Sequence, residues 1–283
     1  MSEKILIACD STCDLSAELC ERYQIKILPM GVTLGGRHYT DGVDIDPDKI
    51  YEIYEQTGEL PQTSAVNLGE YADFFARYTA EGYSVILFTI SAEFSSSYQN
   101  ACAAGADYDN VFVVDSRNLT CGVGILAVSA CDMVKEGKSA FEIAEACRAL
   151  TAQVDTSFVI DSLEFLHKGG RCSALAALGA NLLHFKPCIA VHDGVMGVGK
   201  KYRGKFETVL KQYIADRLGD GSDIDCTRIF VIHAGIDESL FRECAELTAS
   251  LAPFEDVLLS RAGCTVSSHC GRNTFGLAFL RKA

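Results

Sequence analysis

Short runs of hydrophobic residues alternate along the first half of the chain with segments of helical hydrophobic spacing. Residues 5–8, 85–90 and 111–114 are apolar runs whose length is typical of buried strands. Between the first two runs, residues 71–78 place four aromatic side chains at intervals of three and four, which favours a helix. This alternation predicts βαβ units in a mainly parallel sheet.

The pattern continues beyond this sheet into a second series of elements. Two helices, within residues 125–134 and 141–150, close the first half. The second series comprises strands at 156–160, 188–191, 195–198, 229–233 and 257–259, and helices that end at Lys168 and that span 174–183, 206–218 and 239–251. At 283 residues the chain exceeds the comfortable size of one core, so we expect two α/β domains, residues 1–153 and 154–283. No Pro or Gly linker occurs at 151–155, so these domains are expected to pack tightly.

Composition narrows the class of protein. Hydrophobic residues make up 48% of the chain and charged residues 22%, which predicts a globular protein throughout. The longest apolar runs are far shorter than the roughly 20 residues of a membrane span, and the N-terminus lacks the features of a signal peptide. We therefore expect a cytoplasmic protein without a membrane span. The net charge of −13 disfavours a nucleic acid partner.

The cysteines and histidines argue against a metal or a disulfide framework. The 13 cysteines are scattered through expected strands and helices of a large chain, which favours reduced thiols. No Cys-x-x-Cys occurs, and no two histidines are spaced i, i+4. We expect no metal and no cofactor.

Hydroxyl side chains follow three of the expected parallel strands, at the sheet edge where α/β proteins bind ligands. They are Ser11 and Thr12 after the first strand, Ser91 and Ser95–Ser97 after the second, and Ser116 and Thr120 after the third. Neutral donors at this edge would suit a carboxylate or a phosphate, although for any single hydroxyl the preference of Ser and Thr for N-caps favours a capping role. Thr63 and Ser64 differ, because Asn67 and Glu70 already supply a capping box for the next helix.

Two further motifs are open to both a structural and a functional interpretation. Gly169 and Gly170 form an ordinary helix stop, but Arg171 then stands at the start of the next apolar helix, where its guanidinium could bind an anion. His269 alone is more typical of a loop histidine than of a functional one. Asp10 and Asp115 end strands and are interpreted as structural. No Gly-x-Ser-x-Gly, P-loop or Gly-x-Gly-x-x-Gly motif follows a strand, so hydrolase, ATPase and dinucleotide sites lack their required parts.

Taken together, these segments resemble the DegV family in order and spacing over nearly the whole chain. The matching segments are residues 10–15 (DSTCDL), 39–45 (YTDGVDI), 63–64 (TS), 94–101 (FSSSYQNA), 114–116 (VDS), 166–171 (LHKGGR), 186–187 (KP) and 269–271 (HCG). Departures occur where the family has Gly and Thr, here Ser96 and Ser97, and where it has His-Thr-Gly-Pro-Gly, here His269 followed by Cys, Gly, Arg and Asn.

The resemblance implies a two-domain α/β protein that holds a long-chain fatty acid between its domains. By position, the carboxylate-binding residues would be Thr63, Ser64, Ser95, Arg171 and His269. It further implies that the protein is not itself an enzyme but the acyl-carrying subunit of a fatty acid kinase. A separate ATP-binding subunit would phosphorylate the bound acid to an acyl phosphate for phospholipid synthesis.

Two other functions remain alternatives at the level of sequence. One is a stand-alone acyl hydrolase or transferase with Ser95 as nucleophile and His269 as base, for which no third, orienting residue is evident. The other is a regulatory lipid sensor without a kinase partner.

Overall fold

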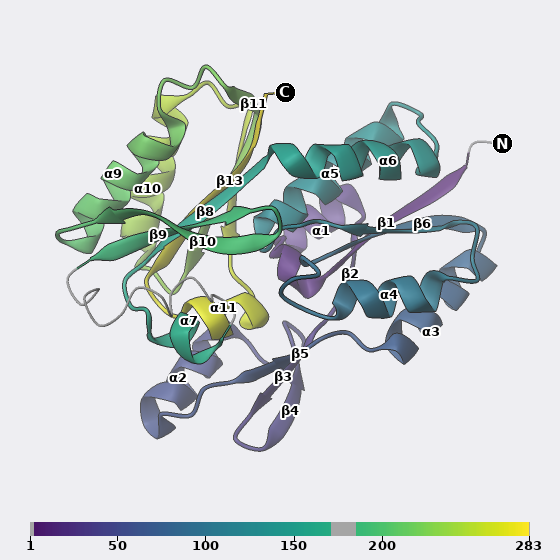
Figure 1. The fold of residues 1–283 in the computed structure, drawn as a ribbon, viewed down its shortest axis with the longest axis horizontal. Coiled ribbons are helices and arrows are strands. Elements are labelled where there is room, and N and C mark those ends of the chain that lie inside the picture. Colours follow the sequence, from purple (N-terminus) through teal and green to yellow (C-terminus); the bar gives the residue numbers. More distant parts are fainter. Residues whose placement is uncertain (1–2, 171–184, 283) are drawn as a thin grey trace.

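A parallel sheet forms the centre of the first half of the chain in the computed structural model, which describes residues 3–170 and 185–282 (Figure 1). Its strands, in spatial order, are β2 (Lys26–Leu28), β1 (Lys4–Asp10), β6 (Tyr83–Thr89) and β7 (Val111–Asp115). Its helices are η1 (Ser11–Cys13), α1 (Ala17–Tyr23), α3 (Leu68–Ala80), α4 (Ser97–Gly105), α5 (Cys121–Lys135) and α6 (Ala140–Leu150). All three strand pairings are parallel, as the sequence predicts.

A small antiparallel sheet, which the sequence does not predict, lies below the parallel sheet in Figure 1. It consists of β4 (Arg37–Thr40), β3 (Gly31–Leu34) and β5 (Gln62–Ser64), and α2 (Pro47–Thr57) lies in the connection between β4 and β5. β5 has only three residues, all polar, so no hydrophobic alternation marks it as a strand. This strand carries Thr63 and Ser64.

The second half is built on a mixed six-stranded sheet. Its order is β10 (Val195–Tyr202), β9 (Lys186–His192), β8 (Val154–Ile160), β13 (Thr274–Arg281), β11 (Ile224–Ala234) and β12 (Asp256–Arg261). Its helices are η2 (Thr151–Gln153), α7 (Glu164–Lys168), α9 (Phe206–Leu218), α10 (Glu238–Leu251) and α11 (Cys264–Cys270). Only the β11–β12 pairing is parallel.

One hydrophobic core joins the two halves through α5. Ten residues of this helix are buried. The core around them combines side chains of the parallel sheet, such as Ile86 and Phe88, with side chains of the six-stranded sheet, such as Phe230 and Ala278. The chain passes from one sheet to the other at Val154, where β8 begins.

The strands and helices expected within 5–168 and 188–259 are confirmed. The helix expected at 174–183 lies outside the described residues. The sequence indicates a loop at His269, but the structure places this residue in helix α11. The N-cap residue of α11 is Gly263, which has no side chain to accept from the first N–H groups of the helix, so the sequence carries only a weak local start signal.

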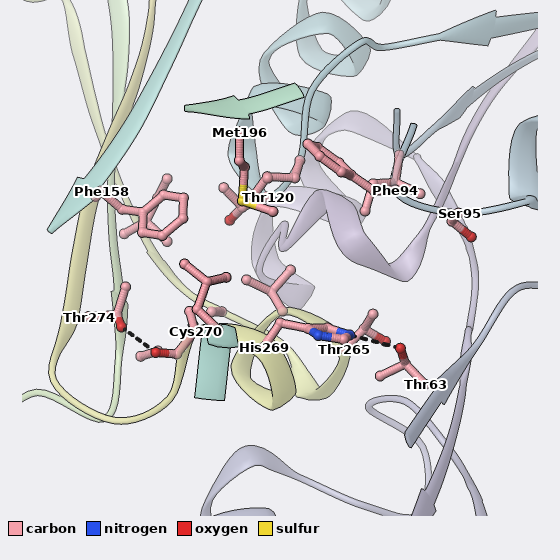
Figure 2. Close-up of a pocket in the computed structure, with 18 of the residues that line it drawn as sticks. Thr63, Phe94, Ser95, Thr120, Phe158, Met196, Thr265, His269, Cys270 and Thr274 are labelled. Carbon is pink, nitrogen blue, oxygen red and sulfur yellow. Dashed lines mark hydrogen bonds between the residues drawn. The ribbon is translucent and has the colours of Figure 1, made fainter. Parts of the chain in front are cut away.

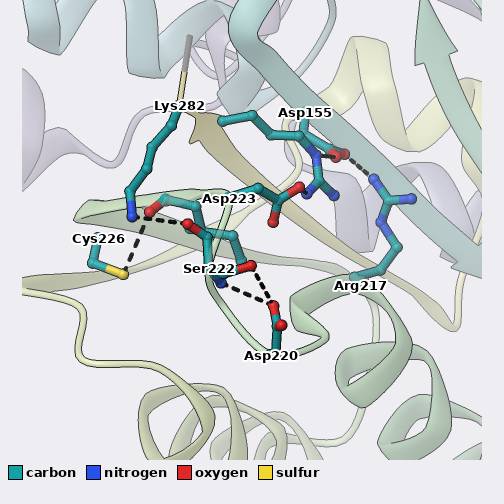
Figure 3. A network of polar contacts seen from close by, with 9 residues as sticks. Asp155, Arg217, Asp220, Ser222, Asp223, Cys226 and Lys282 are labelled. Atoms are coloured by element: carbon teal, nitrogen blue, oxygen red, sulfur yellow. Dashed lines mark hydrogen bonds and ion pairs between the residues drawn. The ribbon is translucent and has the colours of Figure 1, made fainter.

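A partly buried ion-pair network links β8, β13 and α9 of the second half (Figure 3). Asp155 of β8 accepts hydrogen bonds from Arg217 of α9 and from Nε of Arg281 on β13, the latter at 2.6 Å. The Asp155 side chain is only 13% exposed, whereas Asp223, which also pairs with Arg281, is 60% exposed. Asp155 therefore links two strands and one helix at a site that water screens only partly.

We predict that Asp155→Ala lowers the free energy of unfolding by about 2–4 kcal/mol, because it leaves two partly buried arginines without their shared carboxylate. Urea denaturation followed by circular dichroism measures the change. Asp223→Ala is the matched control and should cost less than about 1 kcal/mol, because its ion pair is exposed. Equal losses in the two variants would contradict this assignment.

Candidate functional site

A cavity of about 330 Å³ lies between the two halves of the chain (Figure 2). Its volume is within the range of roughly 300–1,000 Å³ that is typical of small-molecule sites. The apolar part of its wall includes Ile90, Phe94, Leu119, Phe158, Leu166, Met196, Ile232, Ala234, Ala262 and Val266. Both halves contribute, so the site requires their packed arrangement.

Thr63, Ser95 and His269 make one side of this wall polar. Thr63 Oγ1 lies 2.9 Å from Nε2 of His269, although the two residues are 206 positions apart in sequence. Figure 2 shows Thr63 and Ser95 on the same side of the cavity, opposite Phe158 and Thr274. The structure therefore brings together three of the five residues expected to bind a carboxylate.

Ser96, the middle residue of the serine run 95–97, also lines the cavity. It is the N-cap residue of α4, and its side chain makes no capping hydrogen bond. The first turn of a helix has free N–H groups and a partial positive charge, both of which favour a nearby anion. The signal was present in the serine run, but three adjacent serines do not reveal which of them faces a ligand.

Two buried carboxylates from the first half hold α11, which carries His269. The backbone N–H of Gly263 donates to Asp14 Oδ1 at 2.8 Å. Asp41 accepts from the backbone N–H groups of Cys264 at 2.8 Å and Thr265 at 3.1 Å. These bonds replace the missing local cap and complement the positive end of the helix.

The threonines that line the rest of the cavity direct their hydroxyls away from it. Thr120 donates to Asp14, Thr265 donates to Asp41 at 2.6 Å, and Thr274 donates to backbone carbonyls at 3.1 Å. Their donors are thus satisfied inside the protein, and their methyl groups remain for contact with a ligand. The cavity is therefore more apolar than its sequence composition indicates.

The DegV family model matches residues 4–282. A DegV domain-containing protein of Clostridium acetobutylicum is 33% identical over 283 residues, which cover 99% of each chain. The chain belongs to the DegV family.

Solved structures of fatty-acid-binding proteins have the same fold over nearly the whole chain. A fatty-acid-binding DegV family protein of Thermus thermophilus superposes with a TM-score of 0.88 at 27% identity, covering 98% of this chain and 99% of that one. A stearic-acid-binding protein of Eubacterium ventriosum gives 0.84 at 30% identity, with 98% of each chain covered. DegV of Bacillus subtilis, a fatty acid binding protein, gives 0.84 at 27% identity and covers 99% and 100%.

Of the remaining two residues that the DegV resemblance implies, Ser64 does not reach the cavity. Ser64 is exposed, does not line the cavity, and occupies the space over Gly31 of β3, where a Cβ would lie 2.2 Å from its hydroxyl. Successive side chains of a strand point to opposite faces, which explains why Thr63 and Ser64 separate. Arg171 lies outside the described residues.

The Gly169–Gly170 pair ends α7 and lies against α11, whereas the anion site expected at Arg171 falls outside the described residues. Gly170 has φ +67°, the left-handed conformation of an ordinary helix stop. Gly169 lies against His269, and a Cβ at this position would come within 2.5 Å of Nδ1 of the imidazole. A side chain at Gly169 would displace His269 from its position beside Thr63.

Most of the other candidate hydroxyls and acids are structural. Ser11 donates to Asp41, Ser91 donates to the carbonyl of Gly194, and Ser116 donates to the carbonyl of Asn118. Asp10 accepts from Thr12 and from the backbone of Ile90, and its burial raises the pKa of the carboxyl to about 6. Among the described residues, no group of three or more metal-binding side chains occurs, and no helix is long and apolar enough to cross a membrane.

His233 is a titratable group in the cavity wall that belongs to no sequence motif. Burial lowers the pKa of its imidazole to about 4, and the nearby charge of Arg261 acts in the same direction. The backbone N–H of Ile236 donates to Nδ1 at 3.4 Å, which requires the neutral form at that nitrogen. The ring also packs against Phe241, with the ring centroids 4.2 Å apart.

We predict that His233 makes the folded protein less stable as the pH falls from about 6.5 towards 4. The unfolded chain binds a proton near pH 6.5 and the folded protein only near pH 4, so protonation favours unfolding within this window. Urea denaturation at pH 7 and pH 5 should show a larger loss for the wild type than for His233→Gln. Because other titrating groups are common to both proteins, the difference isolates His233. Equal losses would show that His233 titrates normally.

Proposed function

We propose that this DegV protein binds one long-chain fatty acid in the cavity, with the carboxylate at Thr63, Ser95 and His269. The observation that carries the proposal is the apolar cavity between the two halves, polar on the side where these three residues lie. Fatty acid binding named for two DegV proteins, and stearic acid binding named for a third protein of the same fold, support it. We further propose that the protein presents this carboxylate to a separate ATP-dependent kinase, which converts it to an acyl phosphate.

The energetics favour a fatty acid over a short polar ligand. Each buried methylene contributes roughly 0.8 kcal/mol, so a tail of about fifteen gives on the order of 12 kcal/mol before the entropy costs of binding. The carboxylate loses its hydration, and this loss is tolerable only where donors replace the water. Thr63, Ser95 and the N-terminus of α4 are donors of this kind.

The geometry gives less support to a stand-alone hydrolase. A serine nucleophile needs a base within hydrogen-bonding distance. The side-chain partner of Ser95 is Ser97, at 3.1 Å, whereas Nε2 of His269 lies beside Thr63. Ser95 and His269 are therefore better suited to bind a carboxylate than to attack an acyl group.

The direct test is binding of palmitate or stearate to delipidated protein by isothermal titration calorimetry, with native mass spectrometry of the protein as purified. We expect one fatty acid per chain. Protein that is ligand-free as isolated and binds neither acid would refute the proposed function.

We predict that Thr63→Val and Ser95→Ala each weaken palmitate binding about tenfold to a hundredfold, because each removes a donor from a desolvated carboxylate at a cost of roughly 1.5–3 kcal/mol. Ser64→Ala is the matched control, since Ser64 neighbours Thr63 but lies outside the cavity wall. The melting temperatures should change little. A sharp drop in melting temperature with unchanged affinity would instead assign these hydroxyls to structure.

For Arg171 we predict a larger effect on phosphoryl transfer than on fatty acid binding. The tail supplies most of the affinity, but a γ-phosphate must approach a carboxylate of the same sign, and a guanidinium would stabilise the developing charge. Arg171→Ala is assayed for palmitate affinity and for acyl phosphate formation with ATP, magnesium and the kinase subunit. Proportional losses in both assays would assign Arg171 to carboxylate binding alone.

A further inference from the structure

The phenol of Tyr71 is buried without a hydrogen-bond partner. Tyr71 lies on α3 and is 0% exposed, and its hydroxyl is one of the few buried polar atoms in the described residues that remain unsatisfied. Such a group destabilises the folded protein relative to a phenylalanine at the same position. A buried, unsatisfied donor close to a binding site calls for a functional explanation.

Ser97 is the hydroxyl next to this phenol. It begins α4, is also 0% exposed, and lies close enough to Tyr71 to lower the pKa of the phenol, which burial raises. Packing of α3 against α4 fixes this proximity, and Asn100 of α4 secures the helix by donating to the carbonyl of Val66 at 2.8 Å. Tyr71 itself does not line the cavity.

Ser97 in turn contacts Ser95, which lines the cavity. The two hydroxyl oxygens are 3.1 Å apart, and the backbone N–H of Ser97 donates to Ser95 Oγ at 3.2 Å. Three hydroxyls thus lie in sequence from the interior of the protein to the cavity wall: Tyr71, Ser97 and Ser95.

A bound carboxylate determines the direction of hydrogen bonding along this series. An ionised carboxylate only accepts, so Ser95 must donate to it, and each hydroxyl has only one proton to donate. Ser95 can then only accept from Ser97, which leaves the oxygen of Ser97 to accept from Tyr71. Donors aligned in one direction strengthen one another.

We propose that Tyr71 is a positioning residue for the fatty acid carboxylate, acting through a relay in which Tyr71 donates to Ser97, Ser97 donates to Ser95, and Ser95 donates to the ligand. This inference rests on the proposed function. Asp10, Glu70 and Cys9 also raise the pKa of the phenol, but none of them accepts a hydrogen bond from it, and Asp10 already accepts three hydrogen bonds from Thr12 and Ile90. The relay gives the Tyr71 proton an acceptor once ligand is bound.

Tyr71→Phe tests the relay, because it removes only the hydroxyl. We expect palmitate affinity to fall roughly three- to tenfold, while the melting temperature of the ligand-free protein stays the same or rises. Affinity for hexadecan-1-ol should change less, because an alcohol both donates and accepts and therefore imposes no direction on the series. A purely structural role of Tyr71 would not distinguish the two ligands.

Matched variants complete the experiment. Tyr78→Phe makes the same change two turns along α3, outside the cavity wall, and should leave both affinities unchanged. Ser97→Thr keeps the relay hydroxyl and should retain the affinity for palmitate. Ser97→Ala removes this hydroxyl and should lower the affinity, and adding Tyr71→Phe to Ser97→Ala should then cause no further loss.

The outcomes separate the relay from the proposed function. If the wild type binds palmitate and Tyr71→Phe binds it equally well, or loses palmitate and hexadecan-1-ol affinity alike, the relay is wrong and the binding function stands. If the wild type fails to bind palmitate, the proposed function itself is wrong.

Discussion

Hydrogen bonds from the N-terminus of α11 to Asp14 and Asp41 hold the two halves of the molecule in the arrangement that forms the site. α11 has seven residues and is far too short to be stable alone. Its first N–H groups are satisfied by carboxylates more than 220 positions earlier in the sequence. Because His269 lies on this helix, the polar side of the cavity exists only where the first half supplies these acceptors.

The fold could be predicted where a segment carries its own signal. The runs that became β1, β6 and β7 are long and apolar, and Asn67 with Glu70 forms the expected capping box. Elements that depend on distant partners gave no such signal. β5 is a strand because it pairs with β3, and α11 is a helix because Asp14 and Asp41 cap it.

The residues of the candidate site, like the elements of the fold, could be predicted only as far as local sequence determines them. Capping a helix and binding a carboxylate use the same hydroxyl groups, so the sequence could propose Ser95 but could not separate it from Ser91, which bonds to Gly194. Nor could it decide between Thr63 and Ser64, because the face of β5 that meets the cavity depends on its register with β3. His233 and Tyr71 belong to no motif and become candidates only through burial.

The position of β13 in the middle of the six-stranded sheet has a consequence for the synthesis of the protein. β13 is the last strand in the described sequence, and it lies between β8 and β11. Until the ribosome has released residue 281, the β8–β9–β10 group and the β11–β12 pair have no strand to join them. A nascent chain therefore exposes the edges of both groups, which other chains can pair with. The protein therefore completes this sheet and the part of the cavity wall that β13 supplies only after β13 itself has been translated.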